Sequence, residues 1–125
     1  MAKPKPFKFG PNQEKWLHAL ETTKRKQTRG KLQSKAGGFC CLGLACITLG
    51  VKPETRDDGI YFDGDSRILS DRLRKTMGLY ESMGSSRFGT DGRTLTKLND
   101  NARWPFKKIA AHLRENPRAY FSRSA

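Results

Sequence analysis

The feature that most constrains the fold is an apolar run at residues 37–49, which reads Gly-Gly-Phe-Cys-Cys-Leu-Gly-Leu-Ala-Cys-Ile-Thr-Leu. This run contains no charged residue and holds all three cysteines of the chain. Left exposed, it would place a large apolar patch in water, so the other elements must cover it. With 13 residues it is shorter than a membrane span, which needs about 20. We therefore expect a buried helix that the rest of the chain packs around, with Gly43 allowing close approach of a neighbour.

Length and composition predict one small domain around this helix. A chain of 125 residues is the usual size of a single domain, and a hydrophobic fraction of 35% predicts a small core. Long alternating strand–helix–strand units are absent from the pattern, which disfavours a doubly wound sheet. We expect an α+β fold in which a few short helices, three to five in number, surround the Cys-rich helix beside a small antiparallel sheet or hairpin. The expected parts are a basic Lys/Pro arm at 1–11, a globular domain at 12–116 and a basic aromatic tail at 117–125.

Local signals predict where the other elements begin and end. Asn12 is an expected N-cap for a helix that runs to about Thr23 and turns Trp16, Leu17 and Leu20 toward the core. The remaining elements are expected as a short strand at 60–62, a helix at 70–77 capped by Ser70 and stopped by Gly78, a Gly- and Ser-rich loop at 79–92, a helix begun by Thr94 and broken at 99–101, and an amphipathic helix at 105–116. In the tail, Tyr120 and Phe121 lie between cations; docking onto the domain is the favoured interpretation and base stacking is the alternative.

The strongest functional signal is the charge of residues 24–35, which we call the basic segment. It reads Lys-Arg-Lys-Gln-Thr-Arg-Gly-Lys-Leu-Gln-Ser-Lys, and no acidic residue occurs between Thr22 and Pro53. The whole chain carries a formal charge of +13, which favours polyanionic partners such as nucleic acid, nucleotides or an acidic protein face. A solvated connector is the structural alternative. The candidate anion-binding residues are Lys24, Arg25, Lys26, Arg29, Lys31, Lys35, Lys107 and Lys108.

The acidic residues gather at 54–65, where Asp58-Gly59 and Asp63-Gly64 predict turns. The spacing of a calcium-binding loop is absent, so we expect these acids to form turns and to neutralise part of the basic flank.

The sequence offers no catalytic or metal-binding signature. The cysteines lack the spacing of a structural zinc site and lie among apolar residues, so we expect buried, reduced thiols that pack as small hydrophobic groups. No nucleophile elbow, phosphate loop or dinucleotide-binding fingerprint is present. We expect a non-enzymatic protein with no cofactor. The first residues alternate Lys and Pro without a secretory apolar region, and this favours the cytoplasm.

Several motifs together resemble a group of small phage-encoded proteins of unknown role. The resemblance extends from Trp16 to Leu113 and implies a phage accessory protein acting in the host cytoplasm, without assigning catalytic residues. The motifs are Trp16-Leu17-His18-Ala19-Leu20, then Gln27, Gly30 and Leu32, Cys40-Cys41-Leu42-Gly43-Leu44-Ala45-Cys46, Leu69-Ser70-Asp71, Thr94-Leu95-Thr96-Lys97-Leu98-Asn99-Asp100 and Phe106-Lys107-Lys108-Ile109-Ala110.

Two functional hypotheses follow. In the first, the Lys/Arg surface binds nucleic acid or a nucleotide-like ligand; capture of a small nucleotide would require a pocket lined by an arginine and an aromatic residue. In the second, the protein blocks or redirects a host enzyme or defence component, using its positive charge to mimic or meet an acidic surface, with Phe88, Trp104 or Tyr120 as exposed anchors.

Overall fold

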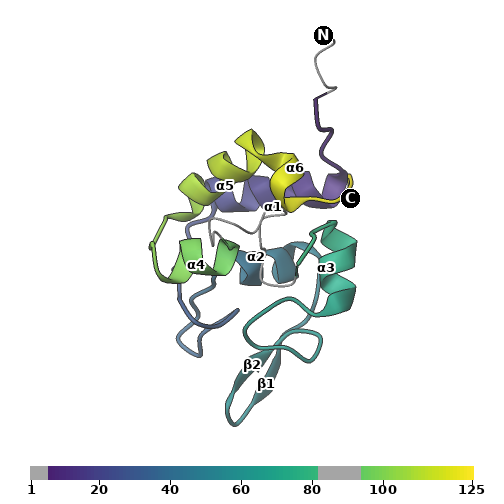
Figure 1. Cartoon of the computed structure of the whole chain (residues 1–125). Helices are drawn as coiled ribbons and strands as arrows, with labels where there is room; N and C mark the ends of the chain where they lie inside the picture. The colour runs from purple at the N-terminus through teal and green to yellow at the C-terminus, as the bar shows by residue number, and fades with distance from the viewer. Residues whose placement is uncertain (1–5, 82–93) are drawn as a thin grey trace.

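The computed structural model of the chain describes residues 6–81 and 94–125. The described elements are α1 (Pro11–Thr22), α2 (Cys41–Thr48), β1 (Glu54–Arg56), β2 (Gly59–Tyr61), α3 (Asp71–Met77), α4 (Leu95–Asp100), α5 (Phe106–Glu115) and α6 (Pro117–Tyr120). Helices α1, α5 and α6 form one layer, and α4, α2 and α3 form a second layer beneath it (Figure 1). The strands form a two-stranded antiparallel hairpin below the second layer, with Glu54 opposite Tyr61. The predicted α+β class, with short helices around a buried Cys-bearing helix and a small hairpin, is confirmed.

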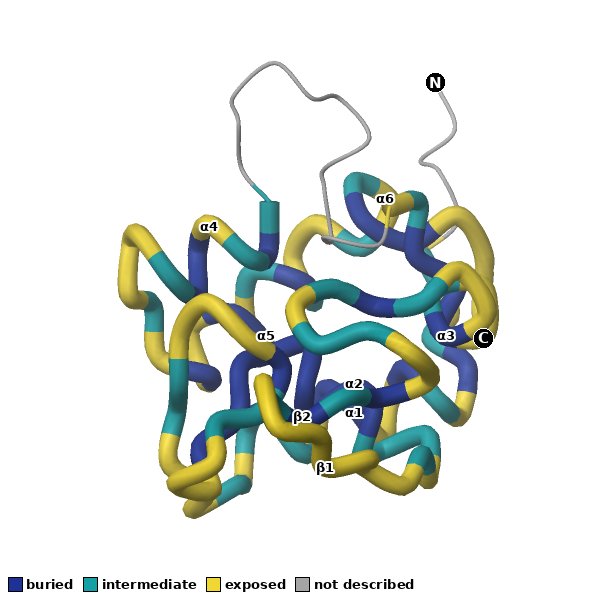
Figure 2. The backbone as a smooth tube through the Cα atoms, turned by 90° about the horizontal axis from the view of Figure 1, so that it is seen from below, coloured by how far each residue is buried: buried dark blue, intermediate teal, exposed yellow. Residues whose placement is uncertain are grey.

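Helix α2 lies at the centre of the core. All residues from Cys41 to Cys46 are buried, and α1 and α4 pack against it. The buried backbone runs through α2 and the facing sides of its neighbours in Figure 2. The helix is shorter than the apolar run predicted, because the backbone of Phe39 instead forms bridges with Gln27 and Gln33. Cys40 then caps the helix, its Sγ accepting a hydrogen bond from the backbone N–H of Gly43 at 3.3 Å.

Helix α1 begins one residue earlier than its expected cap. Gly10 is the N-cap and Pro11 the first helical residue, a position that suits proline because its missing N–H has no intrahelical partner there. Asn12 therefore lies inside the helix, and the prediction of Asn12 as N-cap is wrong. The predicted core face is confirmed, since Trp16, Leu17 and Leu20 are buried.

Helices α3 and α5 follow their local signals. Ser70 caps α3 by accepting a hydrogen bond from the N–H of Leu73, and Gly78 ends that helix with a φ of 76°. In α5 the buried residues are Phe106, Ile109, Ala110 and Leu113, as the amphipathic pattern predicts.

Helix α4 begins and ends where the sequence predicts. Thr94 caps the helix as expected. The break expected at 99–101 is confirmed, because α4 ends at Asp100 with Asn101 as its C-cap; Asn99 lies inside the helix and is buried. Of the loop predicted at 79–92, residues 82–92 lie outside the described part of the chain.

The C-terminal segment packs onto the start of α1. Tyr120 and Phe121 are buried, and the rings of Phe7, Phe9 and Trp16 surround Phe121. Within the described residues, 117–125 thus docks as the favoured interpretation predicts, and it forms part of the same core as the 12–116 region.

Candidate functional site

The basic segment is held by its backbone and by one buried side chain. Phe39 and the segment exchange two backbone hydrogen bonds, from Thr28 N–H to Phe39 O and from Phe39 N–H to Lys26 O, each 2.8 Å long. Leu32 is fully buried, and its carbonyl accepts from the N–H of Cys40 at 3.1 Å. Anchoring through backbone and leucine leaves the charged side chains free to point outward.

Every candidate cation is exposed. Within residues 6–81 and 94–125, none of these side chains forms an ion pair with a carboxylate, whereas other cations do: Arg72 pairs with Asp63, Arg74 and Lys75 with Asp71. The exposed, unpaired cations of the site are Lys24, Arg25, Lys26, Arg29, Lys31, Lys35, Lys107 and Lys108.

One end of the basic segment lies against the start of α5. The Nε2 atom of Gln27 donates to the carbonyl oxygen of Trp104 at 2.8 Å and to Oδ1 of Asn99 at 2.7 Å. Lys108 Nζ lies over the Trp104 ring, 4.3 Å from its centroid. These contacts bring α5 and the segment to the same side of the molecule, where α4 also lies (Figure 1). Trp104 thus contacts both Gln27 of the basic segment and Lys108 of α5.

The other end of the segment lies against the hairpin. Lys35 Nζ donates to the backbone oxygen of Asp57 at 2.8 Å. The acids of the hairpin bind elsewhere: Glu54 pairs with Arg56 at 3.1 Å, and the Tyr61 hydroxyl donates to Asp58 at 2.7 Å. In the described part of the chain no ion pair joins these acids to the basic segment, although the charge of Lys35 adds to the hydrogen bond from Tyr61 in lowering the pKa of Asp58.

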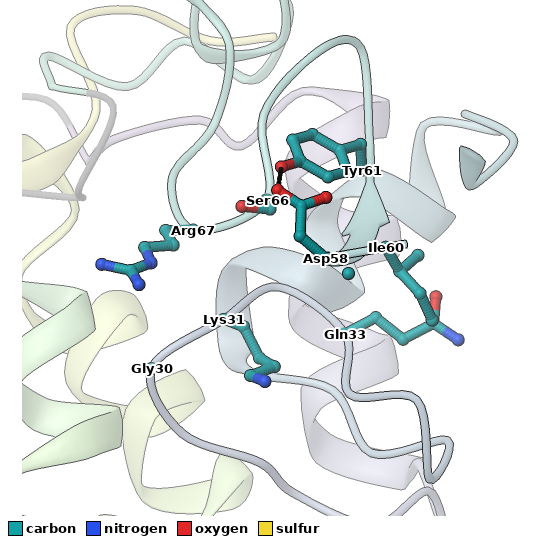
Figure 3. Close-up of a pocket in the computed structure, with 9 residues that line it drawn as sticks. Gly30, Lys31, Gln33, Asp58, Ile60, Tyr61, Ser66 and Arg67 are labelled. Carbon is teal, nitrogen blue, oxygen red and sulfur yellow. Dashed lines mark hydrogen bonds between the residues drawn. The ribbon is translucent and has the colours of Figure 1, made fainter. Parts of the chain in front are cut away.

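A pocket of about 350 Å³ opens between the segment and the hairpin (Figure 3). A hydrogen bond of 2.8 Å from Leu32 N–H to Ser66 O joins two of its walls. The lining residues are Gly30, Lys31, Gln33, Asp58, Gly59, Ile60, Tyr61, Ser66 and Arg67.

Local bonds set the protonation of the pocket's acidic wall. The hydrogen bond from Tyr61 lowers the pKa of Asp58 and raises the pKa of the Tyr61 hydroxyl. Arg56 covers one face of the Tyr61 ring, its guanidinium carbon 4.1 Å from the ring centroid. Asp58 is therefore an ionised acceptor at neutral pH, beside a tyrosine whose ring has one face occupied.

Sequence reasoning identified Lys31 of this pocket but not Arg67 or Tyr61. Three segments separated along the chain supply the walls, and no local pattern predicts that 66–67 lies beside 30–33. The Leu32–Ser66 hydrogen bond is a long-range tertiary contact without a periodic signal in the sequence.

The thiols of α2 and its cap lie in the core. Burial raises the pKa of Cys40 and of Cys46 to about 12, and raises that of Cys41 well above its ordinary value. All three are free and buried, as predicted, and such thiols are poor nucleophiles. Among the residues described, no group of three His, Cys, Asp or Glu side chains is placed to hold a metal ion.

The proposed aromatic anchors differ in exposure. Trp104 is half-buried, while Tyr120 is buried and lies 2.7 Å from His112 through its hydroxyl. Tyr120 as an exposed anchor is therefore wrong, and Phe88 lies outside the described residues.

None of the helices in the described ranges combines the length and the apolar character that crossing a membrane requires.

Comparison with known proteins gives one partial match. Searches of the curated proteins and of the solved structures return no match. A family model described as Domain of unknown function (DUF8296) matches residues 12–59, a stretch that includes most of α1, the basic segment, α2 and the hairpin through Gly59.

Proposed function

We propose that this protein is a small, non-enzymatic accessory protein that binds nucleic acid through the basic segment and the start of α5. The observation that carries the proposal is the set of exposed cations without carboxylate partners in the described structure. Their charge is available to phosphates, and releasing the counterions of the nucleic acid would drive binding. The resemblance to phage-encoded proteins extends the proposal to action in the cytoplasm of a host cell.

The backbone anchoring of the segment supports a pre-organised surface. Because Leu32 and Phe39 hold the segment through the core, binding would order side chains more than backbone. A backbone that is already ordered lowers the entropy cost of binding, so more of the electrostatic attraction contributes to the net affinity. Gln27 further joins the segment to Asn99 of α4 and to Trp104, which lies two residues before α5 begins. These bonds hold the segment beside the start of α5, where Lys107 and Lys108 lie.

A salt titration tests the proposal. Fluorescence anisotropy with labelled single- and double-stranded oligonucleotides is measured at 50 and 200 mM NaCl. If six to ten phosphates are contacted, affinity falls by roughly 10³- to 10⁵-fold between these conditions. Absence of binding at 50 mM contradicts the proposal.

A matched pair of variants locates the surface. Lys24→Gln/Lys26→Gln/Arg29→Gln removes three cations of the basic segment, while Lys52→Gln/Arg72→Gln/Lys75→Gln removes three exposed cations elsewhere. The segment variant should flatten the slope of log affinity against log salt by about 1 for each phosphate that the protein no longer binds. Equal effects of the two variants would show that net charge alone, and not this surface, is responsible.

A protein partner is the second candidate. The half-buried Trp104, with Lys108 over its ring, offers an aromatic anchor beside a cation, a combination found at protein interfaces. Affinity capture from a nuclease-treated host lysate, compared with a Trp104→Ala variant, tests for an acidic host protein. A stoichiometric partner that the variant fails to capture favours this candidate, and its retention by the variant contradicts a role for Trp104.

A further inference from the structure

We propose that the pocket between the basic segment and the hairpin binds a single nucleoside monophosphate, with the phosphate at Lys31 and Arg67 and the base at Asp58 and Gln33. This proposal is independent of nucleic-acid binding by the basic segment and the start of α5, because the ligand contacts only the residues that line the pocket. We further infer a preference for guanine from the hydrogen-bonding groups that line the pocket.

The pocket has the size and the firm walls that a small ligand needs. Its volume of about 350 Å³ lies in the range of roughly 300–1,000 Å³ found for small-molecule sites. The bond from Leu32 to Ser66 and the bond from Lys35 to Asp57 join the basic segment to the loop after β2 and to the hairpin. The walls are thus linked to one another without a ligand.

The cationic side of the pocket suits a phosphate. Lys31 and Arg67 are exposed, and neither has an ion pair within the described ranges. A guanidinium group can bind two phosphate oxygens at once, and an ammonium group adds a compact charge. In Figure 3 the side chains of Arg67 and Gln33 lie on opposite sides of the pocket and extend away from each other, so both side chains must turn inward to contact one ligand.

The other side of the pocket is rich in acceptors. Gln33 Oε1 is buried and has no hydrogen-bond partner among the described residues. Asp58 accepts from Tyr61, and an ionised carboxylate can accept further hydrogen bonds. We infer that the Gln33 side chain turns when the ligand binds, so that a donor of the ligand satisfies its unpaired oxygen.

These acceptors favour guanine over the other bases. Guanine carries adjacent N–H donors on its ring nitrogen and on its exocyclic amino group, which complement Asp58 and Gln33. Adenine and uracil each present one donor group on the corresponding edge. Stacking is not the main contact, since Arg56 already covers one face of Tyr61.

Isothermal titration calorimetry on the full chain tests the proposal with GMP, AMP, UMP and inorganic phosphate. We expect GMP to bind about 10- to 100-fold more tightly than AMP or UMP, the range that one hydrogen bond to a charged group provides. Inorganic phosphate should bind more weakly than GMP. No detectable nucleotide binding, phosphate binding as tight as GMP, or equal affinity for the three nucleotides would each overturn the proposal.

Three variants assign the roles. Arg67→Gln should weaken all three nucleotides alike, and Asp58→Asn should remove the GMP preference while AMP and UMP still bind. The variant Lys24→Gln/Lys26→Gln/Arg29→Gln leaves the pocket lining intact and should retain GMP binding even where oligonucleotide binding is abolished. Unchanged GMP affinity in Arg67→Gln, or an unchanged preference in Asp58→Asn, would contradict the assignment.

Discussion

Gly43 lies where the backbone of the basic segment meets α2. A Cβ at this position would overlap the carbonyl oxygen of Leu32 and would lie 2.8 Å from its carbonyl carbon. The neighbouring atoms are backbone and not the end of a flexible side chain, so the clash has no easy relief. The sequence prediction that Gly43 permits close approach is confirmed, although the sequence did not identify Leu32 as the neighbour.

Replacing Gly43 by Ala tests this contact through the sign of the effect. In an open helix interior, Gly→Ala stabilises by roughly 0.5–1 kcal/mol. Here we expect the clash to reverse the sign and to lower the free energy of unfolding by about 1–3 kcal/mol. Urea denaturation of the two proteins measures the difference, and a more stable Gly43→Ala variant would contradict the contact.

Asn99 connects three parts of the chain through its buried amide. Its Oδ1 accepts from Gln27 Nε2 at 2.7 Å and from the N–H of Cys41 at 3.2 Å, while its Nδ2 donates to the Thr28 oxygen at 2.8 Å. The N–H of Cys41 is one of the donors at the start of α2 that have no partner within that helix. One side chain thus caps the central helix and fixes the basic segment.

Asn99→Ala should therefore be strongly destabilising. Loss of the amide leaves buried groups unpaired, and each unpaired group costs roughly 1–3 kcal/mol. We therefore expect the free energy of unfolding to fall by about 2–4 kcal/mol. Asn101→Ala, one position past the end of α4 and exposed, is the matched control and should change stability by less than about 0.5 kcal/mol. Similar unfolding midpoints for the two variants would argue against the network.

At the scale of elements, Arg114 joins α5 to α1. Its guanidinium bonds Glu21 with two distances of 2.8 Å and reaches Glu14 at 3.3 and 3.4 Å, so one side chain spans two turns of α1. The hydrogen bond from Arg114 is the main cause that lowers the pKa of Glu21. The same contacts raise the pKa of Arg114, so the arginine remains charged at every accessible pH.

This pairing predicts a dependence of stability on pH. The pKa of Glu21 is lower in the folded than in the unfolded chain. Its contribution to the free energy of unfolding is therefore complete above the unfolded pKa of about 4.5, and it is lost as the pH falls through the pKa of the folded chain. For a partly exposed pair we expect about 0.5–1 kcal/mol. The difference in unfolding free energy between wild type and Glu21→Gln should be constant from about pH 6 to 8 and shrink toward pH 3.

Glu115→Gln is the matched control for Glu21→Gln. Glu115 is exposed on the same helix as Arg114, and no ion pair involves it in the described structure. Its replacement should leave the unfolding free energy within about 0.5 kcal/mol of wild type. A Glu21→Gln deficit that persists unchanged at pH 3 would show that packing, and not charge, stabilises this contact.

At the scale of the whole molecule, positive charge exceeds negative charge by 13. Five acids of the described structure pair with arginines outside the basic segment, among them Glu54 with Arg56 and Asp63 with Arg72. No ion pair within the described ranges compensates the charge of the basic segment, and like-charge repulsion opposes the compact state. The charge imbalance that favours a polyanion thus lowers the stability of the free protein.

Added salt should consequently stabilise the free protein. Raising NaCl from about 20 to about 300 mM shortens the screening length from roughly 20 to roughly 6 Å. We expect the melting temperature to rise by about 2–5 °C. For a chain of this size, this shift corresponds to an increase of about 1 kcal/mol or less in the free energy of unfolding. The variant Lys24→Gln/Lys26→Gln/Arg29→Gln should respond less, and a fall in wild-type melting temperature with salt would contradict the repulsion.

Features that depend on neighbouring residues could be predicted from the sequence. Caps at Ser70 and Thr94, the stop at Gly78 and the buried face of α5 rest on short-range hydrogen bonds or on helical periodicity, which a local pattern encodes. Burial of the cysteines could also be predicted, because they lie in a long uncharged apolar run that would be unfavourable in water. The exposure of the basic segment was predicted for the converse reason: unpaired charges remain in water.

Contacts between residues far apart in the sequence became known only from the three-dimensional fold. Phe39 forms β-bridges with Gln27 and Gln33, so the central helix starts later than the apolar run. Asn99 is buried and accepts a hydrogen bond from Gln27 of the basic segment, and Arg67 and Lys31 line one pocket. Each outcome depends on hydrogen bonds or contacts across long separations in sequence. Such contacts have no local period or spacing, because chain folding and not the adjacent residues brings the partners together.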